Sequence, residues 1–133
     1  MNNFLYGDTT DKIIGCFFKV LSSNRKYRGY SEASFSAALA IELQDKGFRV
    51  REQVALRQMY KKRQVGIEYA DMIVNDLIVI EIKKVGHIKE NHINQALSYL
   101  QDSGLAVGLI LNFGSYKPQI KRIYEKSNAP EEY

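Results

Sequence analysis

Two short apolar runs on either side of Asn75-Asp76 constrain the fold of this chain more than any other feature. The first run is "IEYADMIV", residues 67–74, and the second is "LIVIEIKK", residues 77–84. Both are rich in β-branched residues, which favour strands, and an Asn-Asp pair between such runs is typical of a turn. The runs therefore predict two antiparallel strands joined as a hairpin.

Charged residues interrupt both of these strands. Asp71 lies in the first, and Glu81 and Lys83 lie in the second. Side chains alternate between the two faces of a strand, so Glu81 and Lys83 share one face. Unpaired charge inside a core is expensive, and the three residues therefore need a chemical reason to be there.

The length of the turn decides which residue lies opposite Asp71. A two-residue loop at Asn75-Asp76 pairs Asp71 with Ile80, whereas a three-residue loop over 75–77 pairs it with Glu81. We predict the longer loop, because register follows the hydrophobic pattern and this register separates polar from apolar residues better. The more polar face then holds Tyr69, Asp71, Ile73, Val79, Glu81 and Lys83, and the apolar face holds Ala70, Met72, Val74, Ile78, Ile80 and Ile82.

This register brings two carboxylates to within about 5 Å of each other, with an ammonium group beside them. Adjacent carboxylates repel unless a cation lies between them, and repulsion raises the pKa of at least one. A hard divalent ion such as Mg²⁺ suits oxygen ligands, and a neighbouring lysine can orient or deprotonate a metal-bound water. The alternative is a structural salt bridge in which Lys83 neutralises Asp71 and Glu81.

The rest of the chain predicts helices and further strands around this hairpin. Helices are expected from Thr9 or Thr10 to about Leu21, from 32 to 46 after a Ser31 cap, and from about 88 to 101. Strands are expected over 48–60, before a turn at 61–66, and over 105–113; residues 119–125 fit a strand or a helix. The order ααβββαβ favours a mixed sheet with helices on both sides.

Composition indicates one globular domain over residues 1–133, with flexible tails at 1–7 and 126–133. The chain has 45% hydrophobic and 26% charged residues, and no run approaches the roughly 20 apolar residues of a membrane span. Its one cysteine, Cys16, excludes an internal disulfide and a cysteine-rich zinc site. With no secretory signal visible at the N-terminus, we expect an intracellular protein, cytoplasmic or nuclear.

Basic residues cluster in two places along the chain. One cluster is Arg25, Lys26 and Arg28, and the other is Lys61, Lys62 and Arg63. The net charge of +4 is mild and by itself decides nothing about nucleic acid. Each cluster is either a solvated turn or a contact for phosphates.

An acid on one strand followed by Glu-x-Lys on the next resembles the PD-(D/E)XK nuclease superfamily, here as Asp71 and Glu81-Ile82-Lys83. Within it the chain looks like the small GxxExxY proteins, whose motif is here "GYSEASF", residues 29–35, with Phe35 in place of the usual Tyr. Other segments that match are "AALAIELQDKGFRV", "HINQALSYL" and "GLILNFG". The resemblance covers about residues 11–123.

The resemblance implies a restriction-endonuclease-like, three-layer α/β/α fold and a nuclease that uses Mg²⁺, or Mn²⁺, to hydrolyse nucleic acid, DNA being favoured. It assigns the metal to Asp71, Glu81, the carbonyl of Ile82 and Glu32, and the positioning or activation of water to Lys83. Gln95 and Tyr99 match a Gln-x-x-x-Tyr element that steadies the active site or touches nucleic acid. Without the resemblance, such a pair is more often the polar edge of an amphipathic helix.

Two further expectations concern partners. A nucleic-acid-binding or protein-interaction module that keeps this fold without catalysis is the alternative to an enzyme. Small nucleases that cut both strands often pair, and the apolar, tyrosine-bearing surface of this chain would allow a homodimer.

Overall fold

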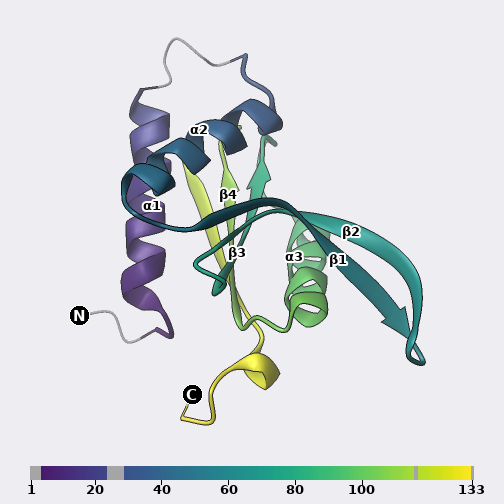
Figure 1. Ribbon diagram of the computed structural model, residues 1–133. Helices are drawn as coiled ribbons and strands as arrows, with labels where there is room; N and C mark the ends of the chain where they lie inside the picture. The colour runs from purple at the N-terminus through teal and green to yellow at the C-terminus, as the bar shows by residue number, and fades with distance from the viewer. Residues whose placement is uncertain (1–3, 24–28, 116, 133) are drawn as a thin grey trace.

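A mixed five-stranded sheet lies between helices on its two faces (Figure 1). The structure is a computed structural model that describes residues 4–23, 29–115 and 117–132. The elements in chain order are α1 (Gly7–Ser22), α2 (Glu32–Asp45), β1 (Val50–Tyr60), β2 (Arg63–Val74), β3 (Ile78–Lys83), α3 (Glu90–Ser103), β4 (Val107–Asn112), β5 (Gln119–Tyr124) and a short 3₁₀ helix, Lys126–Asn128.

The strands follow the order β1-β2-β3-β4-β5 across the sheet. Only β3 and β4 run parallel, with α3 as the crossover between them, and the other neighbours are antiparallel. This arrangement confirms the predicted mixed sheet and α/β/α layering. It also decides the segment at 119–125, which is a strand that pairs with β4.

Two hydrophobic clusters hold the layers together. On one face of the sheet, α1 and α2 contribute Phe17, Phe35 and Leu39 to a cluster that includes Met72 and Ile80. On the other face, α3 packs its buried residues against Ile73, Val79 and Ile110. Every residue of β4 is buried, because helices cover both of its faces. Cys16 is 2% exposed and belongs to the first cluster, as its apolar surroundings in the sequence suggest.

The predicted register between β2 and β3 is confirmed. Val74 pairs with Ile78, Ile73 with Val79 and Met72 with Ile80, which leaves residues 75–77 as the loop. Asn75 and Asp76 have positive φ angles of 53° and 55°, a conformation that Asn and Asp tolerate better than most residues. The ladder stops after Met72, one position before Asp71 would meet Glu81.

The prediction that Ala70 shares a face of the sheet with Met72, and Tyr69 with Asp71, is wrong. Ala70 packs in the cluster under α3, whereas Met72, two residues later, packs under α1 and α2. The cause lies in β1, where Gln53 opposite Asp71 has φ 49° and is missing from the β1–β2 ladder. This left-handed residue breaks the alternation of both strands, so Tyr69 no longer shares a face with Asp71.

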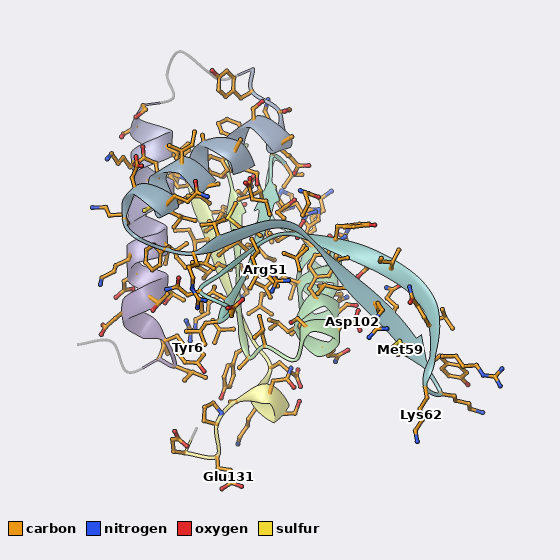
Figure 2. The ribbon with its side chains drawn as sticks, viewed as in Figure 1. Tyr6, Arg51, Met59, Lys62, Asp102 and Glu131 are labelled. Carbon is orange, nitrogen blue, oxygen red and sulfur yellow. The ribbon has the colours of Figure 1, made fainter. Side chains whose placement is uncertain are left out.

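The turn between β1 and β2 is shorter than the sequence indicates. Only Lys61 and Lys62 form it, with φ angles of 47° and 64°, and Tyr60 already pairs with Arg63. Two residues of positive φ match the twist of the flanking strands, which lets the hairpin stay paired to its tip. Lys62 lies at that tip, at the far end of the hairpin in Figure 2.

The ends of the domain are held by specific contacts. Helix α1 begins at Gly7, before Thr9 and Thr10, and Leu5 in front of it is 6% exposed. At the other end, the Asn128 side chain donates hydrogen bonds to the carbonyls of Leu100 and Leu105, both 3.0 Å long. Parts of the expected flexible tails therefore contact the body of the domain.

Among the described residues, none of the helices combines the length and apolar composition that crossing a bilayer requires.

Candidate active site

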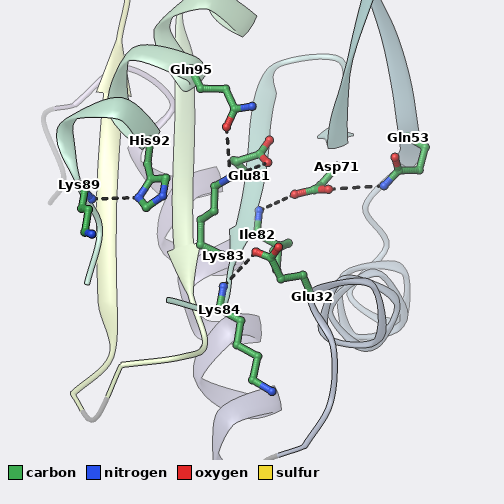
Figure 3. Close-up of polar contacts among 10 residues, drawn as sticks. All are labelled: Glu32, Gln53, Asp71, Glu81, Ile82, Lys83, Lys84, Lys89, His92 and Gln95. Carbon is green, nitrogen blue, oxygen red and sulfur yellow. Dashed lines mark hydrogen bonds and ion pairs between the residues drawn. The ribbon is translucent and has the colours of Figure 1, made fainter. Parts of the chain in front are cut away.

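The candidate site lies where β2 and β3 separate (Figure 3). Beyond Met72–Ile80 the edge of β3 no longer pairs with β2, so its next backbone groups need other partners. The carboxylate of Asp71 supplies one of them: its Oδ2 accepts a hydrogen bond of 2.7 Å from the Ile82 N–H. Asp71 therefore replaces a backbone carbonyl at the opened edge of the sheet.

Glu32 reaches the same edge from the start of α2. Ser31 caps this helix, as predicted, by accepting a hydrogen bond of 3.1 Å from the Ser34 N–H. Oε2 of Glu32 accepts a hydrogen bond of 3.0 Å from the N–H of Lys84, the first residue after β3 and two residues beyond Ile82. Because the N–H and C=O of one strand residue point to the same edge, the Ile82 carbonyl lies between the two carboxylate contacts.

Glu81 and Lys83 point to the α3 side of β3. Glu81 is 6% exposed, and its Oε1 lies 3.7 Å from the Nζ of Lys83. The Lys83 Nζ also donates a hydrogen bond of 3.1 Å to Oε1 of Gln95, on α3. Gln95 therefore holds the lysine in place, which is one of the two roles that the family resemblance implies for it.

The environment of Glu81 favours its protonated form. Burial, followed by the nearby Asp71 carboxylate, raises the pKa of Glu81 to about 9, although Lys83 acts in the opposite direction. Its Oε2 is buried and, as a carboxylate oxygen, accepts no hydrogen bond from the described residues. A buried oxygen without a partner, beside a second carboxylate, is the arrangement that a bound cation would complete.

The donor set fits a small divalent ion, because Asp71, Glu81 and the Ile82 carbonyl offer oxygen ligands only. Mg²⁺ is commonly held by one or two carboxylates and keeps several waters. Within the described ranges, no three His, Cys, Asp or Glu side chains form a metal-binding group. Oε2 of Glu32 accepts its hydrogen bond from the Lys84 N–H. That Glu32 also contributes an oxygen ligand to the metal stays a prediction.

Gln53 is a site residue that the sequence analysis did not identify. Its Nε2 lies 3.4 Å from Oδ1 of Asp71, on the side of that carboxylate away from Ile82. The left-handed backbone at Gln53 places the amide there. No sequence signal marks this position, because "VREQVAL" reads as an uninterrupted alternating strand and Gln is not a residue that favours positive φ.

Other polar residues near the site have structural roles. Tyr99 is 4% exposed, so its surface is not available to nucleic acid. Burial, followed by the nearby Glu81, raises the pKa of its hydroxyl group. The ring of His92 accepts a hydrogen bond of 3.0 Å from the Lys89 N–H and so caps α3. Asn112 accepts from the N–H groups of Val85 and Gly114, which ties the loop after β3 to the end of β4.

The basic cluster of Lys61, Lys62 and Arg63 is not part of this arrangement. Arg25, Lys26 and Arg28 lie outside the described residues. Lys61, Lys62 and Arg63 lie at the hairpin tip, and Arg63 is eight residues, or about 27 Å of extended strand, from Asp71. A cavity of about 460 Å³ is also separate from the carboxylates, since Arg51, Arg57, Asp76 and Asp102 line it.

Comparison with known proteins agrees with this geometry. The model of the PD-(D/E)XK nuclease superfamily matches residues 7–123, which run from the start of α1 into β5 and include all the residues of the candidate site. A search of curated proteins and a search of solved structures each found no match.

Proposed function

Because the chain belongs to the PD-(D/E)XK nuclease superfamily, we propose that it is a metal-dependent nuclease that hydrolyses phosphodiester bonds in nucleic acid, with DNA as the substrate. Within the superfamily we assign it to the GxxExxY proteins, on the motif at residues 29–35. The observation that carries the proposal is the buried Glu81 carboxyl, whose Oε2 lacks a hydrogen bond beside Asp71 and Lys83.

A structural salt bridge accounts poorly for the same residues. Such a bridge repays the desolvation of buried charges only when the remaining lone pairs are also satisfied. Here Lys83 approaches one oxygen of Glu81 at 3.7 Å and gives its shorter hydrogen bond to Gln95. Among the described residues, Lys83 makes an ion pair with Glu81 and not with Asp71, so one ammonium group serves two adjacent carboxyl groups, which supports a role in binding a cation.

Each residue then has a defined task. Asp71, Glu81 and the Ile82 carbonyl would hold a divalent ion, which when bound polarises a phosphoryl oxygen and lowers the pKa of a water. Lys83, which donates a hydrogen bond to Gln95, would orient the attacking water and meet charge developing on the phosphate. Gln53 and the Ile82 N–H keep the Asp71 carboxylate oriented. Glu32 holds the Lys84 backbone and completes the acidic side of the site.

The test is cleavage of single- and double-stranded DNA and of RNA with Mg²⁺ or Mn²⁺. We expect metal-dependent cleavage by the wild type and a loss of about 100-fold or more in kcat for Lys83→Ala, the range seen when one preorganised donor is removed. Asp71→Ala should also be inactive. Lys121→Ala is the matched control, since Lys121 is an exposed lysine on β5, at the opposite edge of the sheet.

Two outcomes would contradict the proposal. Cleavage that survives in both Lys83→Ala and Asp71→Ala would come from another site or from a contaminating enzyme. Nucleic-acid binding without metal uptake or cleavage by the wild type would instead favour a module that keeps this fold without catalysis.

A further inference from the structure

The outer part of the β1–β2 hairpin extends past the rest of the domain as an arm. Figures 1 and 2 show it beyond α3, with Met59 and Lys62 near its end. We call residues 55–69 the hairpin arm. Several of its apolar side chains are exposed to solvent: Met59 51%, Tyr60 63%, Val65 67%, Ile67 47% and Tyr69 53%.

One face of the arm is exposed to solvent, although Ala55 and Arg57 on it also line the cavity described above. Val54, Leu56 and Ala70 pack in the cluster under α3, so the side chains that alternate with them face the other way. These are Ala55 and Arg57 on β1 and their register partners Tyr69 and Ile67 on β2, and all four are exposed. We call these four residues the arm stripe. It begins two residues from Asp71 and leads toward the basic tip.

The charge of the arm is almost entirely positive. Its charged residues are Arg57, Lys61, Lys62, Arg63 and Glu68. Glu68, the one acid among them, is the register partner of Leu56 and so lies on the α3 side, away from the arm stripe. None of the four cations makes an ion pair with a described residue. The arm therefore joins exposed apolar and aromatic surface to unpaired positive charge.

We propose that the hairpin arm binds a single-stranded segment of nucleic acid and leads it to the site at Asp71 and Glu81. This inference rests on the proposed nuclease function and assigns it a class of substrate. Tyr69 and Ile67 lie about 7 Å apart, a spacing that suits successive unstacked bases, and Tyr69 presents a ring on which a base can stack. Arg57 and the tip residues Lys61, Lys62 and Arg63 meet the phosphates.

The chemistry of the arm favours a single strand over two other occupants. A duplex keeps its base faces stacked inside, so it would satisfy the cations and leave the stripe uncovered. A second copy of this chain would bring its own basic tip, and like charges placed together without counter-charge oppose a symmetric arm-to-arm contact. A single strand offers phosphates and flat apolar bases together.

The experiment measures binding of fluorescent oligothymidylate, and of a duplex of the same length, in chelator, so that no cleavage occurs. We expect the wild type to prefer the single strand and Tyr69→Ala to bind it about 5- to 100-fold more weakly, with Tyr69→Phe close to wild type. Lys62→Ala should reduce the slope of log K against log salt by about 0.7, whereas Tyr69→Ala should leave that slope unchanged. Thermal melts verify that the variants fold.

Matched controls come from α1, on the opposite side of the molecule. Phe18→Ala removes an aromatic ring of similar exposure, 46%, and Lys12→Ala removes an exposed lysine; both should bind as the wild type does. Equal or tighter binding of the duplex, binding unaffected by Tyr69→Ala, or a dimer that depends on Tyr69 would each overturn the inference.

The outcomes also separate the two proposals. Arm-dependent binding of single strands without metal-dependent cleavage supports the arm and counts against the nuclease. Metal-dependent cleavage with a KM that is unchanged in Tyr69→Ala supports the nuclease and overturns the arm.

Discussion

At the scale of single residues, the Asp71 and Glu81 carboxyl groups oppose each other's ionisation when no cation separates them. Asp71→Asn removes one charge, and its amide can still accept from the Ile82 N–H while donating toward Glu81. We therefore expect Asp71→Asn to be as stable as the wild type or more stable in chelator, while losing metal-dependent activity. Thermal melts of the two proteins measure this difference. If Asp71→Asn lowered the free energy of unfolding by about 1–3 kcal/mol, the result would instead indicate a structural salt bridge.

The pH dependence of stability gives a second test of the same pair. The folded-state pKa of Glu81 is raised from 4.5 to about 9, so between these values the folded protein holds a proton that the unfolded chain releases. This contribution to stability is complete below about pH 4.5 and is lost as the pH rises through about 9. In chelator, the wild type should therefore lose more stability over this window than Glu81→Gln. If the stability of the wild type and of Glu81→Gln fell by the same amount over this pH range, Glu81 would not be the titrating group.

At the scale of elements, the irregularity in β1 is what orients Asp71. Gln53→Gly keeps a backbone that accepts φ 49° and removes the side chain with its amide, so it should fold normally and bind Mn²⁺ more weakly. Gln53→Val puts a β-branched residue at positive φ, which should cost about 1–3 kcal/mol of stability or straighten the strand. Melts and metal titrations of both variants measure the two effects. Unchanged metal affinity in Gln53→Gly would show that the amide does not position Asp71.

Elements also explain which parts of the chain could be predicted. The helix of residues 32–46 has a Ser cap and a Gly stop, and the strand at 105–113 is uniformly apolar, so local sequence determines both. The break at Gln53 has no such marker: Val50, Val54 and Leu56 keep the spacing of one continuous face, yet Val50 packs with the α1–α2 cluster and the other two with α3. β2 pairs with β3 only over its last three residues, Met72–Val74, and Gln53 lies opposite Asp71, where that pairing has ended.

At the scale of the whole molecule, a bound cation should stabilise the folded state, because the ligands come from β2 and β3 and converge only on folding. The gain is about 2.7 kcal/mol when the free ion is at 100 times its dissociation constant. We expect Mn²⁺ to raise the Tm of the wild type but not of Asp71→Ala. Asp102→Asn is the control: its Oδ2 is also buried without a hydrogen bond, but it lies on α3 beside a separate cavity. A rise in the Tm of Asp71→Ala would place the ion elsewhere.

The sequence by itself determined the layered α/β/α fold, the hairpin register and the acidic-basic trio of Asp71, Glu81 and Lys83, because strand alternation and helix capping are local and act over a few residues. Only the tertiary structure decided that β2 leaves β3 after Met72, that Asp71 and Glu32 then bond to the freed backbone of Ile82 and Lys84, and that Tyr99 is core while Tyr69 is exposed. These outcomes depend on how the sheet twists against α2 and α3, and that twist is set by packing between segments far apart in the chain.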